Sequence, residues 1–228
     1  MKYRFNILKL INYLFVVMLL ISCKKEAVTP STYSEASYKV AVQLNWRSPE
    51  FTVPPNAHVT LLCGMVHSQD TSLWQPGTLA SPGMEVVAEV GSVNTIFTEM
   101  DNIVSKQKAL YKFVMFEPSG AIGSIQTALN LTSEYSFVSL ASMIAPSPDW
   151  FMGIHDVDLF RNKSWVSDTT INMFVYDAGT EDGDVFGYAN PATVPQQNIQ
   201  LLTPSMATVL ANGNTTLAPI ATIRFTKN

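Results

Sequence analysis

The sequence has little cysteine. Its 228 residues contain only Cys23 and Cys63, so an intramolecular disulfide is excluded once either thiol has another use. Cys63 lies within the apolar run Val59–Val66. An activated thiol needs nearby cations or a helix N-terminus, and the surrounding sequence offers neither. We therefore expect Cys63 to be a small buried hydrophobe.

Histidine is also scarce, and the common catalytic motifs are missing. His58 and His67 bound one expected strand, which is poor geometry for a shared zinc without a third close ligand. We expect these two residues and His155 to pack or hydrogen-bond within the fold. The sequence has no Gly-x-Ser-x-Gly elbow, P-loop or His-Glu-x-x-His motif. A Ser/His/Asp set cannot be read from sequence alone, but nothing points to one. We therefore expect no enzyme.

Basic residues are outnumbered by acidic ones. The whole chain has 14 Lys and Arg against 18 Asp and Glu. If residues 1–22 are removed, three cations leave with them, and 11 Lys and Arg remain against the same 18 acids, a formal net charge of −7. A polyanion would be repelled by such a chain. The balance therefore excludes nucleic acid as the expected partner.

The first 22 residues resemble a signal peptide. Lys2, Arg4 and Lys9 precede the apolar run Leu10–Ile21. A membrane-spanning helix needs roughly 20 apolar residues, so this run is short for an anchor and suits a cleaved leader.

Cys23 directly follows this run, in the sequence Leu20-Ile21-Ser22-Cys23. This ending resembles the bacterial lipobox, in which the cysteine is lipidated and becomes the first residue. The alternatives are an ordinary secretory signal and a short uncleaved anchor with an incidental cysteine. Because acyl chains add about 0.8 kcal/mol per buried CH₂, a lipidated Cys23 would hold the protein in the cell envelope. Lys24 follows where Asp retains some lipoproteins in the inner membrane, which favours the outer membrane.

Residues 23–37 form a polar segment that we expect to be a flexible tether, followed by one domain over residues 38–228. Alternating and continuous apolar runs predict strands throughout that domain. They are Tyr38–Leu44, Val59–Val66, Tyr111–Phe116, Tyr135–Ile144, Trp150–Leu159, Ile171–Val175 and Pro219–Phe225.

One segment has helical spacing instead. Ser81 is a suitable N-cap with Pro82 at the first helical position, and Gly91 is placed to end the helix. A second stripe runs from Ile96 to Val104. The sequence therefore predicts a mainly β fold, an antiparallel β-sandwich with a helical insertion.

Carboxylates gather in two loops. Asp149 follows two prolines, and Asp177, Glu181 and Asp182 lie in a glycine-containing loop. Ca²⁺ takes six to eight oxygen ligands, so two such loops at one end of a sandwich could form a calcium site. The loop is not an EF-hand, since Asp182 stands where that motif needs glycine. From the residues alone, a solvated acidic turn is the favoured alternative.

These two loops resemble the spondin N-terminal domain, the family of F-spondin and mindin. The resemblance rests on the runs 145–153 (APSPDWFMG) and 176–180 (YDAGT), and extends from about Tyr38 to Phe225. It implies an antiparallel sandwich similar to C2 domains, with calcium bound near one end by Asp149, Asp177 and Glu181. Glu181 stands where the family usually has aspartate. Asn130 stands where some members have glutamate.

The resemblance also implies recognition at surfaces and not catalysis. Our leading hypothesis is therefore a membrane-anchored, extracytoplasmic binding or adhesion module with one structural Ca²⁺, attached through Cys23, whose ligand is an unidentified surface protein or glycan. Two alternatives stay open: a calcium-dependent surface hydrolase and a purely structural envelope lipoprotein.

Overall fold

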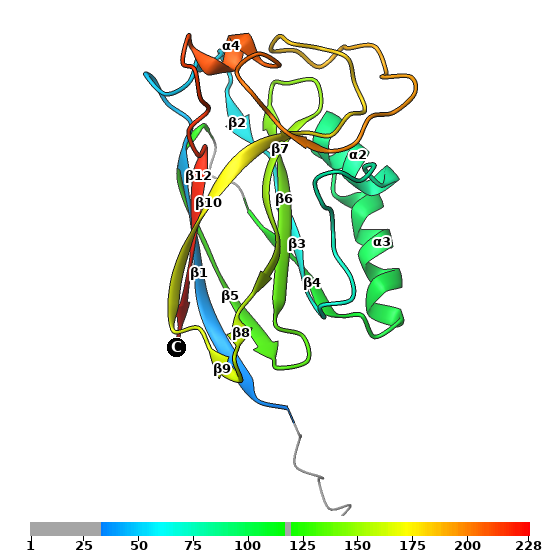
Figure 1. Cartoon of the computed structure of the whole chain (residues 1–228), viewed down its shortest axis with the longest axis vertical. Coiled ribbons are helices and arrows are strands. Elements are labelled where there is room, and N and C mark those ends of the chain that lie inside the picture. Colours follow the sequence, from blue (N-terminus) through cyan, green and yellow to red (C-terminus); the bar gives the residue numbers. More distant parts are fainter. Residues whose placement is uncertain (1–32, 117–119) are drawn as a thin grey trace, which may run out of the picture. The chain divides into compact units, whose positions relative to one another are not determined.

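The computed structural model describes residues 33–116 and 120–228 (Figure 1). The signal peptide, Cys23 and most of the expected tether lie outside the described residues. Tyr33–Asn228 forms one compact unit. None of the helices in this described part is long and apolar enough to cross a membrane.

The unit consists mainly of strands, with three helices among its described residues. The strands are β1 (Glu35–Asn45), β2 (His58–Val59), β3 (Leu62–His67), β4 (Ala109–Met115), β5 (Ile122–Thr132), β6 (Phe137–Ala145), β7 (Trp150–Asp158), β8 (Phe160–Arg161), β9 (Ser164–Trp165), β10 (Asp168–Asp177), β11 (Gln200–Leu201) and β12 (Ala221–Lys227). The helices are α2 (Pro82–Val90), α3 (Asn94–Ser105) and α4 (Thr208–Ala211).

Ten strands form one antiparallel sheet in the order β4-β3-β6-β7-β10-β12-β1-β5, with β2 attached to β6 and β11 to β10. The sheet curls until it is nearly a barrel, and its two layers are the halves of this continuous sheet (Figure 1). The expected mainly β, antiparallel fold with a helical insertion is confirmed.

The main core fills the inside of the curled sheet. β1 alternates as expected, with Tyr38, Val40, Val42 and Leu44 all buried. Burying such side chains contributes about 1.5–3 kcal/mol each. The Tyr38 hydroxyl donates to the carbonyl of Val166 at 2.5 Å, so its polar tip is satisfied inside the core.

A second core lies between the two long helices and the outer face of the sheet. Ser81 caps α2 as predicted, accepting a hydrogen bond from Met84 N at 3.2 Å, and Gly91 ends the helix in the left-handed region. Cys63 is fully buried here, and burial raises the pKa of its thiol to about 12. It is the inert hydrophobe expected from the sequence. Since both cores lie within Tyr33–Asn228, this unit contains the packing it needs to fold alone.

Some elements differ from the sequence prediction. β5 was not predicted, because Gly123, Ser124 and Gln126 dilute its alternation of apolar residues. The expected strand Val59–Val66 is divided between β2 and β3. β1 already begins at Glu35, inside the expected tether.

Gly153 on β7 marks a place where backbone and an aromatic ring approach closely. A Cβ added there would lie 2.8 Å from Trp74 Cζ2 and would also overlap the carbonyl of Leu140. Since overpacking typically costs 1–3 kcal/mol, we expect Gly153→Ala to lower the melting temperature by about 5–10 °C. Gly187→Ala is the control, because its added Cβ meets nothing within 4 Å. Equal melting temperatures for both variants would contradict this packing.

Candidate functional site

Asp149 lies in the turn that joins β6 to β7. The turn is closed by Ser147, whose hydroxyl donates to the Ile144 carbonyl at 2.6 Å and accepts from Trp150 N at 3.3 Å. Behind it, Trp150 is fully buried in the main core. Asp149 is therefore held on rigid backbone, with its side chain fully buried.

The Asp149 carboxylate organises the second acidic loop. Its Oδ2 accepts from Thr180 N at 2.7 Å, from Thr180 Oγ1 at 3.2 Å and from Glu181 N at 3.1 Å. Its Oδ1 is buried and has no hydrogen-bond partner among the described residues. A buried carboxylate oxygen without a donor is costly. Burial accordingly raises the pKa of Asp149.

Asp177 ends β10, directly opposite Trp150 on β7, so the two acidic loops begin on neighbouring strands. Its Oδ1 accepts from Gly179 N at 2.8 Å. Burial first, and then the charges of Asp149 and Asp182, raise its pKa to about 7. The structure thus brings Asp149 and Asp177 together as the sequence predicted.

Glu181 also belongs to this group. Its Oε2 accepts from Asn190 Nδ2 at 3.2 Å. Burial raises its pKa, and the charges of Glu89 and Asp149 raise it further. The longer side chain at this position therefore still lies within the electrostatic reach of Asp149.

Glu89 of α2 is a member of this group that the sequence analysis did not identify. Burial raises its pKa, a hydrogen bond with Thr180 lowers it, and Asp149 is among the charges that raise it. The only indication in the sequence was that Glu89 follows Ala88, which belongs to the buried face of α2. Asn130, by contrast, lies on β5, where its backbone N and O bond the hydroxyl of Tyr111. It has no described contact with the Asp149 loops.

We call Glu89, Asp149, Asp177 and Glu181 the acidic end. It lies at the top of Figure 1, where the β6–β7 turn meets the segment after β10. Among the described residues, no three His, Cys, Asp or Glu side chains are already placed to hold a metal ion. A cation nevertheless fits the chemistry here, because it would satisfy Asp149 Oδ1 and screen carboxylates that raise one another's pKa.

An exposed hairpin-like loop adjoins the acidic end. Glu181 and Ala192 form an isolated antiparallel bridge at its base. Phe186 anchors it, with ring centroids 6.2 Å from Trp46 and 6.1 Å from Trp150. Beside this anchor, Val185 and Tyr188 are more than half exposed. The loop thus combines apolar side chains with carboxylates on a fixed base.

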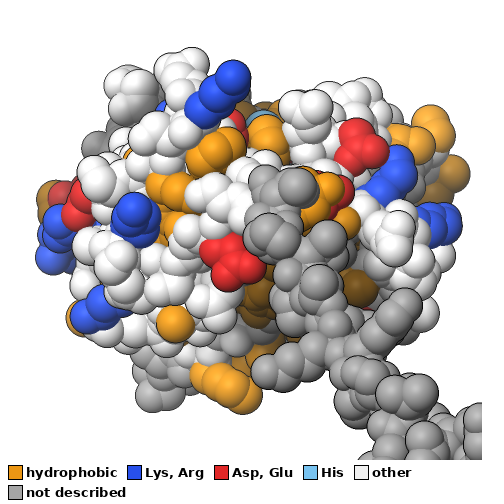
Figure 2. All heavy atoms as spheres, turned by 90° about the horizontal axis from the view of Figure 1, so that it is seen from below, with side chains coloured by type: hydrophobic (Ala, Val, Ile, Leu, Met, Phe, Trp, Pro, Cys, Tyr) orange, Lys and Arg blue, Asp and Glu red, His pale blue; other side chains and the backbone are white. Residues whose placement is uncertain are grey.

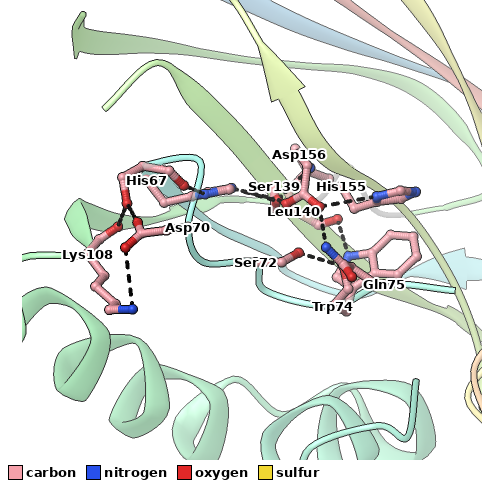
Figure 3. Close-up of polar contacts among 11 residues, drawn as sticks. His67, Asp70, Ser72, Trp74, Gln75, Lys108, Ser139, Leu140, His155 and Asp156 are labelled. Atoms are coloured by element: carbon pink, nitrogen blue, oxygen red, sulfur yellow. Dashed lines mark hydrogen bonds and ion pairs between the residues drawn. The ribbon is translucent and has the colours of Figure 1, made fainter. Parts of the chain in front are cut away.

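A buried polar network lies elsewhere, between β3, β6 and β7 (Figure 3). His67 Nε2 lies 2.8 Å from Ser139 Oγ, and Asp156 Oδ1 lies 3.7 Å from the same His67 nitrogen. A hydrolytic triad instead needs the carboxylate on Nδ1, which here meets the Ser68 carbonyl at 2.8 Å. Ser139 and His67 are both fully buried. The set stabilises the fold and does not have the geometry of a hydrolase.

The opposite end of the domain carries charges of both signs. Seen from below, where β1 begins, Figure 2 shows lysine and arginine side chains interspersed with acidic and uncharged ones. Lys108 pairs with Asp70 at 3.4 Å and Arg224 with Asp168 at 2.6 Å.

Fold and site define a β-domain with a buried carboxylate cluster at one end. The sequence model described as Spondin_N matches residues 36–212, and the chain belongs to this spondin N-terminal family. It is 30% identical to rat (Rattus norvegicus) spondin-2 over 204 residues, 84% of this chain and 62% of that protein. Human (Homo sapiens) spondin-2 is 30% identical over 78% of this chain and 55% of its own length. Chicken (Gallus gallus) spondin-1 is 28% identical over 74% and 22%. The chain thus spans less than two thirds of these relatives.

Proposed function

We propose that this protein is a non-catalytic binding or adhesion module, lipid-anchored in the cell envelope, whose acidic end holds one Ca²⁺. The observation that carries the proposal is the fully buried Asp149 carboxylate, with one oxygen that has no partner among the described residues and three further carboxylates nearby. A divalent cation is the group that best stabilises such a cluster. Membership of the spondin family supports the same reading.

The calcium would have a structural task. Asp149 lies at the end of the β6–β7 turn, and Asp177 begins the segment after β10 that carries the exposed loop around Phe186. Carboxylates from both would bind one ion and fix the two connections together. The loop, with exposed Val185 and Tyr188, would then face its partner with less conformational freedom to lose, which favours binding. A surface protein or glycan is the partner class we propose.

The binding role is tested with the Tyr33–Asn228 fragment on intact cells and glycan arrays. We expect calcium-dependent binding that is lost in EDTA and weakened by Tyr188→Ser, while Lys163→Ser at the opposite end leaves it unchanged. A surface ligand bound equally by wild type and Tyr188→Ser would place the binding surface elsewhere. Absence of any ligand in both formats would favour a structural envelope role.

Membrane attachment is proposed from Cys23, which lies outside the described residues. We expect the full-length protein to incorporate labelled palmitate in a bacterial host and to fractionate with membranes. Cys23→Ala should lose the palmitate label, because the acyl acceptor is removed, and Cys63→Ala should keep it. Palmitate incorporation into Cys23→Ala would contradict lipidation at Cys23.

A further inference from the structure

β5 is an end strand of the sheet. It pairs with β1 along its whole length, from Ile122 opposite Asn45 to Thr132 opposite Glu35. Within the described residues, its other edge is paired with no strand. Along one edge of this eleven-residue strand, the backbone N–H and C=O groups therefore point away from the sheet.

The hydrogen bonds flanking β5 show which residues face outward. Trp46 N donates to the Ala121 carbonyl and Ser133 N to the Ser34 carbonyl, so odd-numbered residues of β5 bond β1. Residues of an antiparallel strand alternate between its two edges. The even-numbered residues therefore direct their N–H and C=O groups to the free edge, as Asn130 confirms through its two bonds to the Tyr111 hydroxyl.

Four residues of β5 have no backbone partner along this edge among the described residues. They are Ile122, Ser124, Gln126 and Ala128, whose side chains are also exposed. Ile122 is 62% exposed, although it is a large apolar residue. Because the Tyr111 hydroxyl bonds the backbone N and O of Asn130, the backbone groups left for a partner extend from Ile122 to Ala128.

Edge strands usually carry protection against pairing with another chain, in the form of lysine, proline, a bulge or a covering element. β5 has no charged residue and no proline, and its register with β1 shows no shift. β4 at the other edge of the sheet differs, because it carries Lys112, which forms an ion pair with Asp101 of α3 at 2.5 Å. Apart from Tyr111 of β4, which bonds Asn130, no described residue protects the free edge of β5.

We propose that β5 pairs antiparallel with β5 of a second copy of this chain. Ser124 lies opposite Gln126 of the second copy, and Ile122 lies opposite Ala128 of the second copy. In this two-fold register all four open residues exchange both backbone hydrogen bonds. A second copy is the favoured occupant because the strand has no charge, so self-pairing places no like charges opposite each other, and exposed Ile122 gains an apolar neighbour.

Antiparallel pairing has a geometric consequence. Each chain enters its domain beside the Thr132 end of β5, where Ser34 and Ser133 are bonded. In the paired sheet the two entry points lie at opposite ends. If the chain is lipid-anchored, as proposed above, the pair joins copies on two facing membranes. This second statement rests on the proposed function, whereas the strand pairing does not.

The pairing is tested by sedimentation velocity of the Tyr33–Asn228 fragment over a concentration series. We expect a reversible dimer. Ser124→Lys with Gln126→Lys places lysines opposite each other twice and should give a monomer. Ser124→Lys with Gln126→Glu places opposite charges there and should keep the dimer. Ala128→Pro removes a free-edge N–H without touching a bond to β1, so it should give a monomer with an unchanged melting temperature.

A wild-type fragment that remains monomeric at the highest concentration overturns the proposal and leaves the edge to a strand of another protein. A dimer that persists in the Lys/Lys variant and in Ala128→Pro also overturns it. The orientation is tested with the fragment attached to nickel-chelating vesicles through an N-terminal histidine tag. Wild type should cluster vesicles, whereas the Lys/Lys variant should not. A dimer in solution without clustering overturns only the facing-membrane statement.

Discussion

Replacing Asp149 by asparagine is expected to abolish the calcium response of the domain without destabilising its calcium-free form. Asparagine has the same shape, and its carbonyl oxygen can accept the bonds that Oδ2 now receives from Thr180 and Glu181. It removes a buried charge whose other oxygen has no partner in the described part of the chain, and it relieves the repulsion acting on Asp177. The calcium-free variant should therefore melt at or above the wild-type temperature.

The melting temperatures of wild type and Asp149→Asn should differ once calcium is added. At a hundred times its dissociation constant, a ligand stabilises the fold by about 2.7 kcal/mol, which corresponds to a rise of about 5–10 °C in the melting temperature of a domain of this size. Differential scanning calorimetry should show this rise in wild type only. Asp184→Asn, which removes the same charge from an exposed loop position, should keep the full response. A calcium response retained by Asp149→Asn would remove Asp149 from the site.

Replacing His67 by alanine is expected to cost about 2–4 kcal/mol, because it opens a cavity and breaks the buried network of Figure 3. The melting temperature should fall by about 5–15 °C. The variant keeps Ser139 Oγ bonded to Asp156 N, at 2.9 Å in wild type, so the fold itself should survive. A loss below 1 kcal/mol would show that the network contributes little.

His67 should also set part of the pH dependence. Burial lowers its pKa from the ordinary value of 6.5. The unfolded chain therefore takes up a proton at a pH where the folded chain does not, and the contribution of His67 is complete above pH 6.5 and declines as the pH falls below it. Asp177 acts in the opposite direction, since its raised pKa makes the calcium-free fold gain stability as the pH falls through about 7. The difference in unfolding free energy between wild type and His67→Ala isolates the histidine, and it should shrink on acidification.

Much of the fold could be predicted because the residues buried in a strand or helix recur at a regular spacing in the sequence. The alternation from Tyr38 to Leu44, the cap at Ser81 and the stop at Gly91 each reflect a local rule, and each is confirmed. β5 escaped prediction because an end strand with an exposed outer face needs few apolar residues. The division of Val59–Val66 into β2 and β3 depends on pairing partners distant in sequence.

The site was predictable only in part. Asp149 and Asp177 stand out in the sequence as carboxylates in two loops, but only the family resemblance favoured one shared site over two solvated turns, because their meeting depends on β7 and β10 becoming neighbours. Glu89 was missed since its approach depends on how α2 packs across the sheet. Asn130 is the opposite case. The resemblance drew attention to this position, but in the structure its backbone lies at the free edge of β5 and bonds Tyr111.

Isothermal titration of Ca²⁺ into the metal-free Tyr33–Asn228 fragment at neutral pH tests the central claim most directly. The acidic end predicts one saturable binding event per chain, accompanied by proton release because the pKa of Asp177 is about 7 in the metal-free fold, and abolished by Asp149→Asn. No calcium-dependent heat up to millimolar concentration, or the same heat from Asp149→Asn, would contradict it.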